Sequence, residues 1–229
     1  MKNKEQLIER CILTPSGLHV REKEEGSESR IIAGYAILFG TPSAPLWSYE
    51  DEEAREVIAP EAVTQEFLDT QDIKMTMFHD RQLILARSNM GQGTLTYSVD
   101  EKGVYFEFEA PHTVDGDKAL ELVKRGDIAG CSFAFTTPYY NEACVSREVE
   151  VKDGVAYITY TVRAITGVYD FTLAADPAYP DTSVDAREFV RELKEREKPQ
   201  PEPKSEKKEE EEIRAQWRAL REAASVPIV

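Results

Sequence analysis

Alternation of apolar and polar positions dominates the chain up to about residue 190 and predicts a protein built mainly of β-strands. Val104, Phe106 and Phe108 are separated by Tyr105 and Glu107, which is the period of a strand with one buried face. Further strand-like runs lie at Ile31 to Gly40 and at Ile73 to His79, and Gly, Pro, Asp and Ser punctuate the chain between such runs. This pattern favours an antiparallel meander.

Turn residues and apolar runs refine the prediction. Segment 147–162 (REVEVKDGVAYITYTV) reads as a hairpin about Asp153-Gly154, and a second hairpin turns at Lys102-Gly103. Segment 128–135 (IAGCSFAF) is apolar almost throughout, as expected of a strand buried on both faces. A last strand is predicted at 168–176 (VYDFTLAAD).

Helical periodicity is limited to a few segments. Pro60 to Asp69 predicts a short helix with an early proline. The segment from Val114 predicts a longer helix with Asp115 as N-cap candidate and Gly126 at its end, and 183–197 predicts a third helix. The predicted fold is a mainly antiparallel sheet that closes into a small β-barrel, with two or three α-helices packed outside.

Composition changes near residue 198 and divides the chain into three parts. Residues 1–197 are the predicted domain, and 198–212 (KPQPEPKSEKKEEEE) form a charged, proline-containing linker. In 213–229, four apolar residues fall on one side of a short amphipathic helix. The alternative is that this end of the chain is a weakly structured tail.

Charge and hydropathy exclude some classes of function. The chain has 43 acidic and 28 basic residues, a formal charge of −15, which disfavours binding of nucleic acid or an anionic membrane through overall electrostatics. No run of about 18 apolar residues and no signal-peptide core occur, so we expect a cytoplasmic protein. The three cysteines lack CxxC spacing, and we expect them to be reduced and structural.

Three polar residues stand out as candidates for chemistry. His79 ends an apolar strand where a polar loop is expected, Ser132 interrupts the buried strand 128–135, and Asp170 interrupts the last strand. A buried hydroxyl or carboxylate needs a partner, and an imidazole would serve Asp170. Taken singly, each residue could also be a satisfied structural group.

Other chemistry finds little support in the sequence. GxGxxG, GxxxxGK, HExxH and GxSxG motifs are absent, which removes the commonest nucleotide, zinc-protease and α/β-hydrolase interpretations. His19 lies in a short strand and His112 beside a proline, and a structural role is favoured for both. No metal or cofactor is implied.

Several motifs taken in order carry a resemblance to a known family. They are GYAILFG, EVIAPEAV, the strand-end FHD, the helix ALELVKRGDIAG leading into CSFAF, and YDFTLAADPAYP. Over roughly residues 8–190 the sequence resembles the prohead maturation proteases of tailed bacteriophages, serine peptidases whose fold is related to the herpesvirus protease assemblin. The resemblance implies that His79 is the general base, Ser132 the nucleophile, and Asp170 the acid that orients the base.

The resemblance leaves two parts of the site less well defined. The family often has glutamate where this chain has Asp170, and Asp80 and Asp176 are the competing carboxylates. An oxyanion hole is also needed for acyl transfer. By resemblance to assemblin, it is expected in the loop after Asp170, around Ala178 and Tyr179.

The function implied is that of a serine endopeptidase inside the assembling phage prohead, in the cytoplasm of the bacterial host. Its expected substrates are scaffolding segments of the major capsid protein and the protease itself, with the portal protein and a homo-oligomer as further candidate partners. No nucleic acid or membrane partner is implied. The alternative is a catalytically silent capsid-assembly or scaffolding module on the same fold.

Overall fold

The computed structural model describes residues 7–11, 17–21 and 29–175. The predicted helix 183–197, the linker 198–212, the terminal helix 213–229, and Asp176, Ala178 and Tyr179 therefore lie outside the described residues. The described strands are β1 (Leu7–Cys11), β2 (His19–Val20), β3 (Ile31–Leu38), β4 (Trp47–Ser48), β5 (Glu52–Ile58), β6 (Asp72–Met77), β7 (Asp80–Asn89), β8 (Gln92–Gly93), β9 (Leu95–Val99), β10 (Gly103–Glu109), β11 (Gly130–Thr136), β12 (Val145–Lys152), β13 (Val155–Val162) and β14 (Gly167–Ala174). The described helices are η1 (Pro60–Ala62), α1 (Gln65–Leu68) and α2 (Val114–Arg125).

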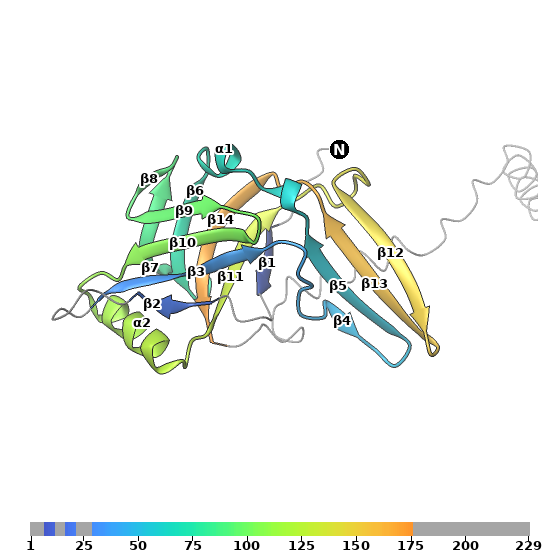
Figure 1. Ribbon diagram of the computed structural model, residues 1–229, viewed down its shortest axis with the longest axis horizontal. Helices are drawn as coiled ribbons and strands as arrows, with labels where there is room; N and C mark the ends of the chain where they lie inside the picture. The colour runs from blue at the N-terminus through green and yellow to red at the C-terminus, as the bar shows by residue number, and fades with distance from the viewer. Residues whose placement is uncertain (1–6, 12–16, 22–28, 176–229) are drawn as a thin grey trace, which may run out of the picture. The chain divides into compact units, whose positions relative to one another are not determined.

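These strands form three sheets in the described part of the chain (Figure 1). The site sheet has the order β1-β11-β14-β6-β7-β8, the covering sheet β2-β3-β10-β9, and the third sheet β12-β13-β5-β4. Most neighbours are antiparallel, as predicted, but β14 pairs with β6 and β13 with β5 in parallel. The fold is thus mainly β with few helices.

The predicted closed barrel is not formed by the described strands. Each of the three sheets has two edge strands that are unpaired on their outer side among the described residues. The chain leaves the site sheet after the two-residue strand β8 and enters the covering sheet at β9, which pairs with β10. Strand β9 lies against β7 and β8 without pairing with them, so backbone strand pairing does not continue from one sheet to the other.

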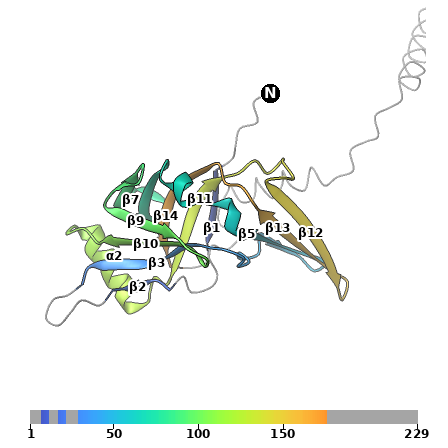
Figure 2. The ribbon, with the colours of Figure 1, turned by 45° about the horizontal axis from the view of Figure 1, so that its top comes forward.

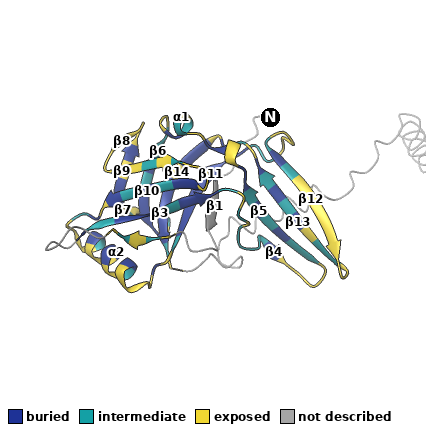
Figure 3. Cartoon of the chain, in the orientation of Figure 1, coloured by how far each residue is buried: buried dark blue, intermediate teal, exposed yellow. Residues whose placement is uncertain are grey.

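Aromatic side chains fill the space between the site sheet and the covering sheet, whose strands cross in Figure 1 and Figure 2. The ring of Phe171 in β14 lies 6.3 Å from that of Phe106 and 6.4 Å from that of Tyr97, centroid to centroid. Val104, Phe106 and Phe108 in β10 are buried, as predicted. The strands of these two sheets carry many of the buried positions (Figure 3). Since side chains alternate along a strand, the face of β14 opposite Phe171 is left for other residues.

Helix α2 begins and ends through capping interactions. The Thr113 hydroxyl accepts a hydrogen bond from the Gly116 N–H at 3.1 Å, so the N-cap is Thr113 rather than the predicted Asp115, which lies in the first turn. Gly126 ends the helix at φ 78°, as predicted. A Cβ added at Gly116 would lie 2.0 Å from the Pro111 carbonyl oxygen, so only glycine fits there without a shift.

The other predicted helix is broken into two short pieces. Residues 60–69 form η1 and α1, and Val63 between them is extended at φ −138°. The Thr64 hydroxyl caps α1 by accepting from the Phe67 N–H at 3.2 Å. Among the described residues, no helix has the length and apolar character needed to cross a membrane.

Candidate active site

Two neighbouring strands of the site sheet carry two of the candidate residues. In the antiparallel pair of β11 and β14, Ser132 lies opposite Thr172 and Ala134 opposite Asp170. Ser132 and Asp170 therefore project from the face opposite Phe171. Both are buried, each with 4% of its surface exposed.

The third candidate residue reaches these strands from a turn. Phe78 and His79 form the two-residue connection between Met77 at the end of β6 and Asp80 at the start of β7. Both have positive φ, 57° and 55°, as a tight hairpin turn of this length requires. Asn-Gly is the usual sequence there, and left-handed backbone at a residue other than glycine costs about 1–3 kcal/mol. The sequence predicted that a polar loop follows His79, but strand β7 begins at the next residue, Asp80.

The His79 ring bridges the other two side chains. Its Nδ1 atom lies 2.8 Å from Asp170 Oδ1, and its Nε2 atom lies 2.8 Å from Ser132 Oγ. The His79 side chain is 17% exposed and that of Asp170 is 6% exposed. Each imidazole nitrogen thus has its own partner, which is the arrangement of a serine nucleophile, a base and an orienting acid.

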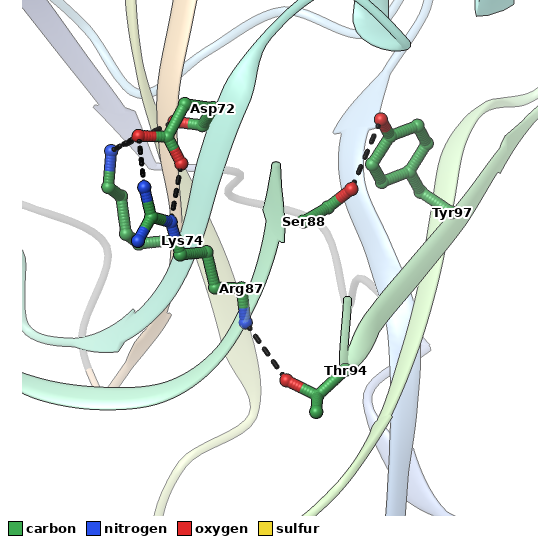
Figure 4. A network of polar contacts seen from close by, with 6 residues as sticks. All are labelled: Asp72, Lys74, Arg87, Ser88, Thr94 and Tyr97. Atoms are coloured by element: carbon green, nitrogen blue, oxygen red, sulfur yellow. Dashed lines mark hydrogen bonds and ion pairs between the residues drawn. The ribbon is translucent and has the colours of Figure 1, made fainter. Parts of the chain in front are cut away.

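A charged cluster of Asp72, Lys74 and Arg87 lies on β6 and β7 of the same sheet (Figure 4). Lys74 is opposite Asp170 in the parallel β14–β6 register, and Arg87 is opposite Lys74. Arg87 donates from Nε and Nη2 to the two carboxylate oxygens of Asp72 at 2.7 and 2.8 Å, and Lys74 Nζ lies 2.7 Å from Asp72 Oδ2. The hydrogen bonds from Arg87 and then from Lys74 lower the pKa of Asp72 to about 2. The Lys74 ammonium group thus pairs with the Asp72 carboxylate, while the Asp170 carboxylate contacts His79.

The match to known proteins identifies the family. The model of the Caudovirus prohead serine protease family matches residues 16–198. The chain belongs to this family. It is therefore a prohead serine protease by family, and the matched region contains His79, Ser132 and Asp170.

The chain was also compared with solved structures and with curated proteins. The structure of the bacteriophage T4 capsid assembly protease, gp21, is similar with a TM-score of 0.37 and 11% sequence identity, over 75% of this chain and 99% of that chain. A search of curated proteins gives no match.

The remaining candidates lie away from the three-residue arrangement or outside the described residues. Asp80 Oδ1 accepts a hydrogen bond from the Gln82 N–H at 2.8 Å. His19 is exposed in β2, with Nδ1 2.6 Å from the Gly17 carbonyl oxygen, and His112 is exposed. In the described part of the prohead protease, no group of three His, Cys, Asp or Glu side chains is placed to hold a metal ion.

Proposed function

We propose that this prohead protease is a serine endopeptidase in which Ser132 is the nucleophile, His79 the general base and Asp170 the acid that orients the base. The observation that carries the proposal is the pair of 2.8 Å contacts from the two nitrogens of one imidazole to Ser132 Oγ and Asp170 Oδ1. Membership of the prohead serine protease family supports it independently.

The proposed reaction proceeds through an acyl-enzyme. Nε2 of the neutral His79 ring takes the Ser132 hydroxyl proton as Oγ attacks the peptide carbonyl, and the Asp170 carboxylate stabilises the resulting imidazolium. The tetrahedral intermediate expels the amine, which receives the proton from His79. Water then attacks the ester with His79 again as base. The bond between the acyl group and Ser132 Oγ breaks, the carboxyl product leaves, and His79 returns the proton to Ser132 Oγ. Ala178 and Tyr179 remain the proposed source of donors to the oxyanion.

The substrates proposed are capsid proteins in the assembling prohead, foremost the scaffolding segment of the major capsid protein and the protease itself. The portal protein is a further candidate. Family membership supports a role in capsid maturation, and removal of scaffolding segments is the cleavage proposed for that role.

Co-expression with the capsid protein of the same phage tests the proposal. Mass analysis should find capsid-protein fragments with the wild-type protease and none with Ser132→Ala. Ser88→Ala is the matched control, because Ser88 is a fully buried serine on β7, outside the His79 contacts. Capsid fragments produced at the normal rate by a folded Ser132→Ala protein would refute the proposal. The absence of fragments with the folded wild-type protein would also refute it and would favour a catalytically silent assembly module.

A further inference from the structure

The turn that carries His79 is held by hydrogen bonds that its backbone N–H groups donate to β14. The Phe78 N–H donates to the Leu173 carbonyl oxygen at 3.1 Å. The His79 N–H donates to Thr172 Oγ1 at 2.9 Å. Because the two turn residues have positive φ without being Asn or Gly, these bonds oppose relaxation of the turn.

Thr172 is placed to connect all parts of the site. It is two residues beyond Asp170 on β14, lies opposite Ser132 across the β11–β14 pair, and accepts from the His79 backbone. Its hydroxyl also accepts a hydrogen bond from Thr76 Oγ1 at 2.9 Å, and both threonines are fully buried. The Thr76 bond restricts the direction in which the Thr172 oxygen can turn.

We propose that Thr172 is a positioning residue of the protease, whose hydroxyl holds the backbone of His79 so that the ring meets Asp170 and Ser132 together. The inference rests on the proposed function. A catalytic side chain must be held within about 0.5 Å of its productive position, and a tight turn with two strained residues does not by itself provide this. The shared acceptor oxygen of Thr172 does.

Three variants of the full chain separate the hydroxyl from the shape of the side chain. Thr172→Val keeps the shape but removes the acceptor, and Thr172→Ser keeps the acceptor. Thr137→Val is the matched control, because Thr137 is buried and its hydroxyl donates to the Ala164 carbonyl oxygen at 2.6 Å. The rate of Ser132 phosphorylation by diisopropyl fluorophosphate measures activation of the nucleophile, and amide hydrogen exchange reports the His79 N–H.

We expect Thr172→Val to slow labelling by about 10²-fold, a loss that a misplacement of about 1 Å can cause, and to speed exchange of the His79 amide. Thr172→Ser should restore both, and Thr137→Val should change neither. A folded Thr172→Val protein that labels at the wild-type rate would overturn the proposal.

The exchange experiment keeps the inference testable in the other cases. If Thr172→Val does not fold, hydrogen exchange of the His79 amide in the wild-type protein tests the proposal. Slow exchange supports the hydrogen bond to Thr172, and fast exchange overturns it. If Ser132 of the wild type is not labelled, the proposed function fails, while exchange of the His79 amide still tests the contact with Thr172.

Discussion

Replacing Asp170 by Asn tests the part of the proposed mechanism that depends on the protonation of one ring. The Asp170 carboxylate is 6% exposed and lies 2.8 Å from His79 Nδ1, so it favours the tautomer with the proton on Nδ1. Asparagine has nearly the same shape but can present an N–H donor at this position. The ring would then carry its proton on Nε2, which faces Ser132 Oγ, and could not accept the hydroxyl proton.

The size of the effect follows from established serine proteases. There the Asp-to-Asn change lowers kcat about 10⁴-fold while the geometry is kept, and catalysis by the oxyanion hole and by binding remains. We expect a loss of at least about 10²-fold for Asp170→Asn, which corresponds to about 2.7 kcal/mol in the activation barrier. Because the shape is kept, the melting temperature should change little.

Labelling of Ser132 by diisopropyl fluorophosphate gives the rate without knowledge of the cleavage sequence. Asp80→Asn is the control, because Asp80 is next to His79 in the chain but its Oδ1 accepts from the Gln82 N–H, and it should label at the wild-type rate. The reasoning is refuted if Asp170→Asn labels as fast as the wild type, or if Asp80→Asn is the slower variant.

Three further predictions concern stability and domain organisation. The hydrogen bonds from Arg87 are the main cause that lowers the pKa of Asp72 to about 2. The ionised Asp72 carboxylate therefore stabilises the folded protein fully above about pH 4, and this stabilisation is lost as pH falls through 2. In urea unfolding across this range, Asp72→Asn should remove the pH dependence, which amounts to less than about 1 kcal/mol because Asp72 is 38% exposed. Gly116→Ala should destabilise by roughly 1–3 kcal/mol in urea unfolding, since the new Cβ would lie 2.0 Å from a carbonyl oxygen; a more stable variant would show that the helix start can shift. Limited proteolysis should cut first between about residues 198 and 212, and protection there would contradict the linker prediction.

Local patterns predicted those parts of the fold that depend on neighbouring residues. The hairpin about Asp153-Gly154 joins β12 and β13, with both turn residues at positive φ, and the strand predicted at 128–135 is buried throughout β11 beyond Gly130. Strand β7 was not predicted, because it opens with Asp80, Arg81 and Gln82 and its pairing with β6 is interrupted by two register shifts. These irregularities disturb the alternation from which strands are recognised.

The parallel pairings and the open sheets also escaped prediction, because they depend on which distant strands meet. For the site, the residue types His79, Ser132 and Asp170 could be chosen from the sequence, and the structure brings these three together. The contribution of Thr172 could not be seen, because threonine is common in strands and its contact with His79 spans 93 positions in the chain.

Peptide mapping by mass spectrometry after treatment with diisopropyl fluorophosphate tests the central claim most directly. We expect a single phosphorylated residue, Ser132, in the wild-type protein, and no labelling of that residue in His79→Ala. A folded wild-type protein labelled on another serine, or Ser132 labelled equally fast in His79→Ala, would contradict the claim that His79 activates Ser132.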